Sequence, residues 1–305
     1  MAEMALVKAL LLDFLPKARI YMDESMAKHS SFRAGGDAAF YVEISSADEL
    51  VRIIPILIAE KVPYVVLGNG TNVLFRDEGY AGVVMKLTGD FENISVDYDK
   101  ISVGAAVPLS KAARVCEENS LTGFEFAAGI PGTAGGAMVM NAGAYGSEMK
   151  DIVYEVKCIS FENDKPESLS LSNKDMDFGY RESVIKKRSY IVTAVTFKLA
   201  QGDKDSIRFN MENLAKKRRD KQPLEFPSAG STFKRPDGFF AGALIEQAGL
   251  KGYSVGDAEV SEKHAGFVIN KGNATAGDII AVIEHVREKV FEMSGVRLET
   301  EVHIL

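Results

Sequence analysis

Two glycine-rich loops hold the residues best suited to bind a charged ligand. The first, Gly68-Asn-Gly-Thr-Asn72, directly follows an apolar segment at residues 61–67 that predicts a buried strand. Glycine lets the backbone approach a ligand closely, and successive backbone N–H groups form a nest for an anion such as phosphate. Asn-Gly is also a common turn sequence, so this loop alone is equally compatible with a simple turn.

The second loop is a stronger signal. Gly129-Ile-Pro-Gly-Thr-Ala-Gly-Gly136 opens a stretch that ends at Gly146 and contains six glycines, with mostly small or apolar residues between them. A flexible linker would instead be polar and rich in serine. We therefore expect buried backbone that packs against a flat or charged ligand, and both loops could serve one dinucleotide pyrophosphate. The pattern G-x-G-x-x-G after a strand is absent, so a Rossmann site is not indicated.

Helices and strands alternate along the chain and would position these loops. Ser46-Ala-Asp-Glu49 predicts a capping box at the start of a helix, which Pro55 should kink or end. A boundary is plausible at residues 200–206, where the apolar pattern breaks, and residues 162–175 read as a surface loop or hairpin. The other expected elements are helices after Pro108, at 206–219 and at 275–293, and strands within 82–87, 94–103, 152–161 and 190–199.

The composition is that of a soluble globular protein. Of the 305 residues, 46% are hydrophobic and 26% are charged, and the net charge of -7 favours neither nucleic acid nor an anionic membrane as partner. Residues 1–20 predict an amphipathic helix rather than a signal peptide, and the apolar run 53–59 is too short to span a bilayer. We expect a cytoplasmic protein without membrane insertion, in which Cys116 and Cys158 are core residues rather than a disulfide or a zinc site.

A series of motifs in a fixed order resembles the family of UDP-N-acetylenolpyruvoylglucosamine reductases, in its shorter type. The matches span nearly the whole chain, and their number and order make the resemblance specific. They are His29-Ser-Ser-Phe-Arg-Ala-Gly-Gly36, Leu67-Gly-Asn-Gly-Thr-Asn-Val-Leu74, residues 129–146, Phe178-Gly-Tyr-Arg-Glu-Ser183, Gln222-Pro223, Pro227-Ser-Ala-Gly-Ser-Thr-Phe-Lys-Arg-Pro236, residues 244–252, residues 260–270 and Leu298-Glu-Thr-Glu-Val302.

The resemblance implies an α+β protein with the FAD-binding fold of the vanillyl-alcohol oxidase (PCMH) type. We expect an FAD-binding domain at residues 1–205, divided into subdomains of about 1–90 and 91–205. The C-terminal strand at 297–305 would return to this domain, and residues 206–296 would form a C-terminal α+β domain that binds the substrate.

The implied reaction is the NADPH-dependent reduction of an enolpyruvyl group on a UDP-sugar, through non-covalent FAD, in peptidoglycan precursor synthesis. Ser231 matches the family's proton donor, Arg181 the arginine that meets the developing enolate, and Glu301 the third catalytic position. Because an ionised carboxylate beside an enolate is unfavourable, we expect Glu301 to be protonated or paired with Arg181. Without the resemblance, these residues read as a turn serine, a surface arginine and a solvated glutamate.

The resemblance also implies binding residues. His264 and Asn270 lie in a matching motif and are expected to be structural, and the basic residues 216–218 read as a solvated helix end. Tyr180, Lys221, Arg235 and Gln247 are expected to contact the substrate. The residues expected to hold FAD are Gly68, Asn69, Gly70, Thr71, Asn72, Gly129, Pro131, Gly132, Thr133, Gly135 and Gly136.

Two other functions remain open from the sequence. A sugar or alcohol oxidase of the same flavin superfamily would keep FAD, commonly tethered through histidine or cysteine. A non-catalytic relative that only binds ligand would carry unsuitable residues at the catalytic positions, whereas Ser231, Arg181 and Glu301 are all present.

Overall fold

The computed structural model describes residues 2–163 and 165–305, which divide into two compact units. The first unit comprises the chain up to Met22, Phe40–Asn69 and Gly82–Lys216, and the second comprises Asp23–Ala39, Gly70–Ala81 and Lys217–Leu305. Each unit is therefore assembled from segments far apart in the sequence. The expected division at residue 205 stays a prediction, because compactness does not reveal which ligand each part binds.

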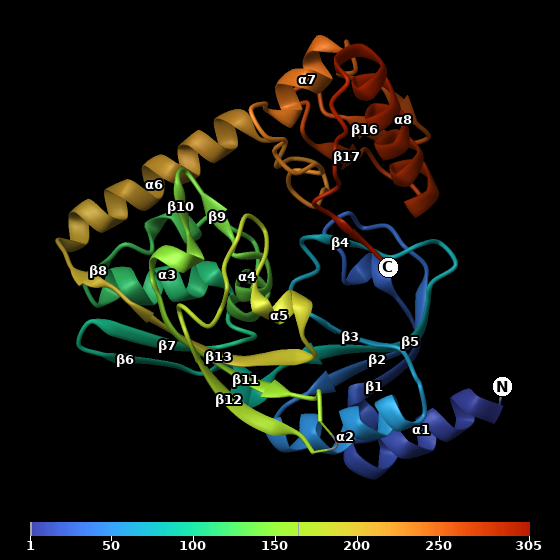
Figure 1. The fold of residues 1–305 in the computed structure, drawn as a ribbon, viewed down its shortest axis with the longest axis vertical. Coiled ribbons are helices and arrows are strands. Elements are labelled where there is room, and N and C mark those ends of the chain that lie inside the picture. The colour runs from blue at the N-terminus through green and yellow to red at the C-terminus, as the bar shows by residue number, and fades with distance from the viewer. Residues whose placement is uncertain (1, 164) are drawn as a thin grey trace. The chain divides into compact units, whose positions relative to one another are not determined.

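Helix α2, Ala47–Ala59, covers part of the first unit's core with one apolar face (Figure 1). Its buried residues Leu50, Ile53, Ile54 and Leu57 follow the helical spacing of the sequence. The hydroxyl of Ser46 accepts a hydrogen bond from the amide of Glu49, as expected of an N-cap. The Glu49 carboxylate, however, accepts from the amide of Ser45 at 2.7 Å, so the reciprocal bond is displaced by one residue from the predicted capping box.

The same helix runs through Pro55 without ending there. Beside it lies a four-stranded sheet with the order β1-β2-β5-β3, in which β3 (Tyr64–Leu67) and β5 (Tyr80–Leu87) are parallel. The first glycine loop follows β3 directly, at the carboxyl end of that strand. Strands β1 and β2 are Ile20–Ser25 and Asp37–Ile44.

A five-stranded antiparallel sheet with the order β12-β11-β13-β7-β6 forms the rest of the first unit's framework. The expected strand within 94–103 is a hairpin, β6 and β7, and the polar segment 162–175 contains β12, which pairs with β11. Helix α4 packs against β13 and β7. The bounds are Ile94–Asp97 for β6, Lys100–Gly104 for β7, Val153–Ser160 for β11, Glu167–Ser172 for β12, Tyr190–Lys198 for β13 and Ala134–Met140 for α4.

The second unit is built on helix α8, Ala276–Ser294, which packs against a three-stranded sheet with the order β15-β16-β17. Thr275 and Asp278 form a capping box, and Gly295 ends the helix in the left-handed conformation. Each of the five fully buried aliphatic side chains of α8 contributes about 1.5–3 kcal/mol of hydrophobic stabilisation; they are Ile279, Val282, Ile283, Val286 and Val290.

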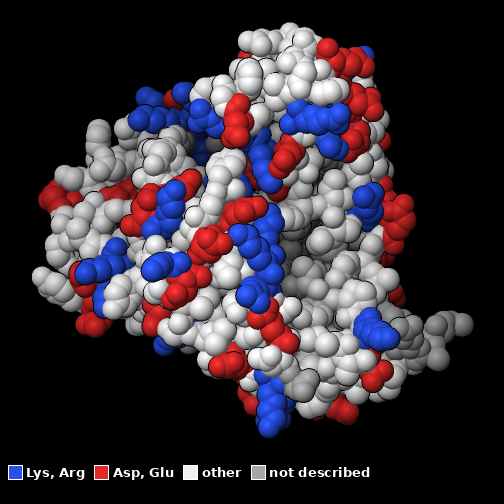
Figure 2. Space-filling view, in the orientation of Figure 1, with Lys and Arg blue, Asp and Glu red and all other residues white. Residues whose placement is uncertain are grey.

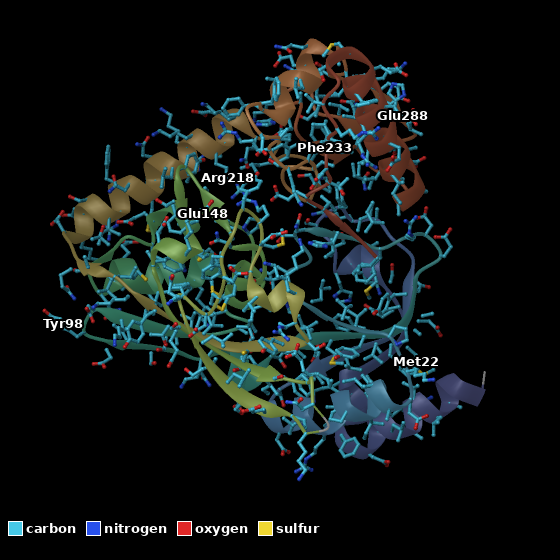
Figure 3. All side chains as sticks on the ribbon, in the orientation of Figure 1. Met22, Tyr98, Glu148, Arg218, Phe233 and Glu288 are labelled. Carbon is cyan, nitrogen blue, oxygen red and sulfur yellow. The ribbon has the colours of Figure 1, made fainter. Side chains whose placement is uncertain are left out.

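Residues from the start of the chain complete this second core. Phe32 and Leu74 are fully buried in it together with Phe233, which Figure 3 labels between α8 and the loops beside it. The last strand, β18 (His303–Ile304), pairs in parallel with β4 (Val73–Leu74). The C-terminus therefore returns to the segment that follows the first glycine loop.

The bounds of the other helices and strands are as follows. The helices are α1 (Ala2–Phe14), α3 (Leu109–Glu118), α5 (Val184–Lys187), α6 (Lys204–Lys221) and α7 (Ala241–Gln247). The strands are β8 (Leu121–Thr122), β9 (Gly143–Ala144), β10 (Ser147–Glu148), β14 (Ala200–Gln201), β15 (Ser254–Val255), β16 (Ala258–Val260) and β17 (Val268–Asn270).

Both cysteines are buried and free, and Cys116 lies on the buried face of α3 with Leu109, Ala112 and Ala113, as expected. Burial raises the pKa of the Cys116 thiol to about 12 and that of Cys158 to about 11. Both are therefore protonated and unreactive at neutral pH. Within the described residues, every helix is too short or too polar to cross a membrane.

The N-terminus of α8 is held by a second carboxylate from the segment after the first glycine loop. Asp77 accepts hydrogen bonds from the amides of Ala276 at 2.8 Å and Gly277 at 2.7 Å. Replacing Asp77 with alanine leaves two helix amides without this acceptor, and we expect a loss of about 2 kcal/mol in the free energy of unfolding. Urea denaturation measures this loss. As a control, changing the neighbouring exposed Glu78 to alanine should alter the free energy of unfolding by less than about 0.5 kcal/mol. Equal losses in both variants would refute the capping role of Asp77.

Candidate active site

Side-chain hydrogen bonds hold the two glycine loops of the first unit together. The side-chain amide of Asn69 donates to the carbonyl oxygen of Pro131 at 2.9 Å. The Nζ atom of Lys86 donates to the carbonyl oxygen of Gly68 at 2.6 Å and to Oδ1 of Asn69 at 3.2 Å. A Cβ atom on Gly68 would lie 2.8 Å from Oγ1 of Thr133, so this close approach requires glycine. The expectation that both loops could serve one ligand is compatible with this arrangement.

The second loop rests on the chain segment that follows β7. The amide of Leu109 donates to the carbonyl oxygen of Gly132 at 3.0 Å, and the amide of Ala134 donates to that of Val107 at 2.9 Å. Within residues 2–163 and 165–305, no hydrogen bond is donated by the amides of Gly132 and Thr133. These two successive N–H groups can bind an anion that approaches the loop.

Lys86 is a site residue that the sequence reasoning missed. It lies half-buried on β5, and burial lowers the pKa of its ammonium group, since desolvation disfavours the charged form. The signal in the sequence was a charged residue inside the apolar run of residues 82–87. That run predicts a strand and does not by itself indicate a binding residue.

The remainder of the first glycine motif, Gly70-Thr71-Asn72, belongs to the second unit. Gly70 has a φ of +63°, and a Cβ atom there would lie 1.8 Å from the carbonyl oxygen of His29. The amide of Ser31 donates to the carbonyl oxygen of Gly70 at 3.0 Å. Only glycine fits this position, because the backbone of the His29–Ser31 segment occupies the space of a side chain.

Ser231 and Glu301, seventy residues apart in sequence, are brought together in the second unit. The amide of Glu301 donates to the carbonyl oxygen of Thr232 at 2.8 Å, and Phe233 bridges Thr300 in antiparallel fashion. Thr232 is fully buried, and its hydroxyl accepts a hydrogen bond from the amide of Val268 at 3.0 Å. Ser231, next to this fixed residue, is exposed, so its hydroxyl is accessible to a ligand.

Asn72 fixes the backbone on the other side of Glu301. Its side-chain amide donates to the carbonyl oxygen of Glu301 at 3.0 Å, and its own carbonyl oxygen accepts from the amide of His303 at 3.0 Å. Three segments distant in sequence, containing Asn72, Ser231 and Glu301, therefore meet within this unit.

Tyr180 and Arg181 form the tip of a tight turn in the first unit. The amides of Gly179 and Glu182 donate to each other's carbonyl oxygens, and Arg181 has a φ of +58°. Its guanidinium lies 5.0 Å from the centre of the Tyr180 ring. The buried Asn141, which ends α4, donates to the carbonyl oxygen of Gly179 at 2.9 Å. This turn is thus tied to the helix that follows the second glycine loop.

Asn141 also donates to the carboxylate of Glu148, on β10, at 2.9 Å (Figure 3 labels Glu148). It adopts the left-handed conformation, with a φ of +41°, and is fully buried. Asparagine tolerates this conformation better than most residues. The sequence reasoning gave Asn141 no role, although it lies inside the matching stretch 129–146.

The other expected substrate residues occupy separate elements of the second unit. Lys221 ends α6 and Gln247 ends α7, and both are exposed. Arg235 lies in the loop before α7, where its guanidinium is 4.0 Å from the centre of the Phe240 ring and its Nε donates to the carbonyl oxygen of Phe239 at 3.3 Å. On the face shown in Figure 2, basic and acidic side chains are intermixed.

Two motif residues, His264 and Asn270, make structural contacts. Asn270 is buried, donates to the carbonyl oxygen of Phe32 at 2.9 Å and accepts from the amides of Gly272 and Ala274, which gives it the expected structural role. Nδ1 of His264 accepts from the amide of Gly266 at 3.1 Å, and burial lowers the pKa of the imidazole. A neutral ring with this acceptor is therefore favoured.

Two buried side-chain oxygens of the second unit have no hydrogen-bond partner among the described residues. They are Oγ of Ser31 and Oε1 of Gln222, and both residues lie in motifs on which the resemblance rests. Buried polar atoms are nearly always satisfied in native proteins, so such atoms mark places where a ligand or water can bind.

The first unit's loops fit a dinucleotide pyrophosphate. They offer close backbone approach at Gly68, two amides at Gly132 and Thr133 that can donate hydrogen bonds to an anion, and one ammonium group at Lys86. These donors suit phosphate oxygens, which take hydrogen bonds from backbone N–H groups and cations.

Comparison with known proteins agrees with this chemistry. Residues 38–165 match the family model described as an FAD binding domain, and residues 222–305 match the C-terminal domain of UDP-N-acetylenolpyruvoylglucosamine reductase. A reductase of that name from Caldanaerobacter subterraneus is 48% identical over 305 residues, covering 100% of this chain and 99% of the relative. One from Clostridioides difficile is 46% identical over 295 residues, covering 97% and 96%.

The crystal structure of the reductase from Thermus caldophilus is similar to this chain with a TM-score of 0.79 and 33% identity, covering 93% of this chain and 97% of that one. The α+β FAD-binding fold expected from the sequence is thereby confirmed. The chain is 48% and 46% identical to these two reductases over nearly their full lengths, and together with both domain matches this shows the family. The chain belongs to the UDP-N-acetylenolpyruvoylglucosamine reductase family and is an FAD-dependent oxidoreductase.

Proposed function

We propose that this protein reduces UDP-N-acetylglucosamine enolpyruvate to UDP-N-acetylmuramate with NADPH as the hydride donor, a step of peptidoglycan precursor synthesis. The observation that carries the proposal is the pairing of the Thr232 and Glu301 backbones at 2.8 Å, which brings Ser231 and Glu301 to neighbouring positions. The names of the full-length relatives support the same reaction.

Bound FAD supplies the redox chemistry, because it can take a hydride from NADPH and give one to the carbon–carbon double bond of the substrate. The protein's own residues must then orient the enolpyruvyl group, stabilise the charge that develops on the carbon next to its carboxylate, and protonate that carbon. Lys86, Asn69 and the amides of Gly132 and Thr133 would hold the diphosphate of the cofactor.

Ser231 is proposed to deliver this proton from its hydroxyl. Its neighbour Thr232 is fixed by three hydrogen bonds, one to Gly266 at 2.8 Å, one from Val268 and one from Glu301. A hydroxyl is a weak acid, but it is matched to a strongly basic enolate when its geometry is fixed. The burial of Thr232 supplies that rigidity while Ser231 stays accessible.

Arg181 is proposed to bind the carboxylate of the enolpyruvyl group as the charge on it grows. Its guanidinium offers a planar fork for two carboxylate oxygens, and the turn between Gly179 and Glu182 limits its backbone. Glu301 is proposed to act beside the enolate in protonated form, since two adjacent negative charges would oppose each other.

Tyr180, Lys221, Arg235 and Gln247 are proposed to contact the UDP-sugar, with the two cations suited to its phosphates. We further propose that residues 206–296 form the substrate-binding part and that the chain up to residue 205, with the strand at 297–305, forms the FAD-binding part. Because NADPH and UDP-sugars are cytoplasmic metabolites, the proposed reaction requires a cytoplasmic enzyme.

Two anaerobic half-reactions test the proposal. We expect NADPH to bleach the flavin absorbance of the purified protein, and UDP-N-acetylglucosamine enolpyruvate to restore it. A flavin that is bleached by NADPH but restored only by oxygen would instead identify an oxidase, and a flavin that survives acid precipitation on the protein would support that function. A protein that binds no FAD would overturn the proposal entirely.

Replacing Ser231 with alanine removes the proposed proton donor. We expect re-oxidation of the reduced flavin by the enolpyruvyl substrate to slow by about 10²–10⁴-fold, while its reduction by NADPH keeps its rate. Stopped-flow absorbance separates the two steps, and Ser254→Ala, at an exposed position of β15, serves as the control. Equal rates of flavin re-oxidation in the wild type and S231A would show that Ser231 is not the proton donor. In the same way, a pH–rate profile of this step that is unaltered in E301Q would argue against a role for Glu301.

Arg181→Lys keeps the charge but loses the planar fork. We expect the re-oxidation step to slow at least tenfold, because an ammonium cannot bind both carboxylate oxygens in the same geometry. The matched control is Arg188→Lys, an exposed residue of the same unit whose partner is Glu162. If R181K and R188K both react at the wild-type rate, Arg181 has no role in stabilising the enolate.

A further inference from the structure

Lys86 is a cation in an apolar setting at the base of the first glycine loop. Its strand neighbours Met85 and Leu87 are buried, and in the parallel pairing of β3 with β5 it lies opposite Leu67, the residue before the loop. The lysine is half-buried, so its ammonium group has lost part of its contact with water. A lysine in this position requires partners that compensate this loss.

The partners of Lys86 are neutral. Its hydrogen bonds go to the carbonyl oxygen of Gly68 at 2.6 Å and to Oδ1 of Asn69 at 3.2 Å. Among the described residues, no carboxylate forms an ion pair with it; Glu92 acts on it only at longer range. Its charge is therefore satisfied by dipoles but not neutralised, and an anion bound at the glycine loops would supply the missing counter-charge.

Lys86 also fixes the orientation of the Asn69 side-chain amide. Because Oδ1 of Asn69 accepts from the lysine, its Nδ2 faces the opposite way and donates to the carbonyl oxygen of Pro131 at 2.9 Å. The chain of hydrogen bonds runs from Lys86 through Asn69 to Pro131. It thereby connects β5, the first glycine loop and the second glycine loop.

We propose that Lys86 is a positioning residue for the FAD diphosphate, which locks the two glycine loops into one anion site through Asn69 and supplies its positive charge. The inference rests on the proposed function only in taking FAD as the ligand of these loops. It does not depend on which substrate the enzyme reduces.

The test is the affinity of the FAD-free protein for FAD, measured by titration of flavin fluorescence. We expect Lys86→Met to raise the Kd at least tenfold, equal to about 1.4 kcal/mol, and to flatten the dependence of the Kd on salt concentration. Lys157→Met, on the exposed side of β11, is the matched control and should leave the Kd unchanged. A Kd for K86M within twofold of wild type overturns the proposal.

A double-mutant cycle tests the connection through Asn69. If Lys86 acts through this residue, Lys86→Met should weaken FAD binding less in an Asn69→Ala background than in the wild type. Fully additive effects would refute the lock between the loops. If K86M does not fold, the Asn69→Ala variant still tests the proposal, because Asn69 is exposed and its replacement should not prevent folding. Wild-type affinity for FAD in N69A would overturn the proposal.

The outcomes separate this inference from the proposed function. A wild-type protein that binds FAD through Lys86 but fails to reduce the enolpyruvyl substrate would refute the function and leave the role of Lys86 intact. A K86M variant with wild-type FAD affinity, in a wild-type background that completes both half-reactions, would refute Lys86 alone.

Discussion

The antiparallel pairing of residues 232–234 with residues 299–301 is the constraint on which the second unit depends. It fixes Thr232 between Gly266, Val268 and Glu301, and it carries Ser231 and Glu301 on adjacent backbones. Asn72 adds a third segment by donating to the carbonyl oxygen of Glu301. The backbones that carry Ser231 and Glu301 therefore lie side by side because of hydrogen bonds between segments that no local pattern would place together.

A similar arrangement holds the first unit, but there the connection is made by side chains. Lys86, Asn69 and Pro131 join the two glycine loops, and Asn141 joins the end of α4 to the turn that carries Arg181. Polar side chains with several hydrogen bonds each specify loop geometry more narrowly than apolar packing would. The loops themselves contribute backbone groups, whose positions these few side chains determine.

Much of this fold follows from local sequence. The helix at 275–293 and the core position of Cys116 are set by neighbouring residues, and these predictions are confirmed. The shift of the Glu49 hydrogen bond to Ser45 was missed, because tertiary contacts such as that of Glu49 with Arg19 decide it. Lys86 and Asn141 were missed because each has a partner distant in sequence: Asn69 lies 17 residues from Lys86, and Gly179 lies 38 residues from Asn141.

The second unit is built from segments near both ends of the chain, and this has a consequence for folding during synthesis on the ribosome. Its core needs Phe32 and Leu74 from the start of the chain and Val286 and Leu298 from the end, and Asp77 caps a helix that begins 199 residues later. These early segments cannot bury their apolar side chains until translation is complete, because contacts between residues so far apart in sequence form last. The first unit ends at Lys216 and can acquire its contacts sooner. A nascent chain stalled before α8 would therefore expose the apolar residues of Asp23–Ala39 and Gly70–Ala81, and these are the segments that a chaperone would meet.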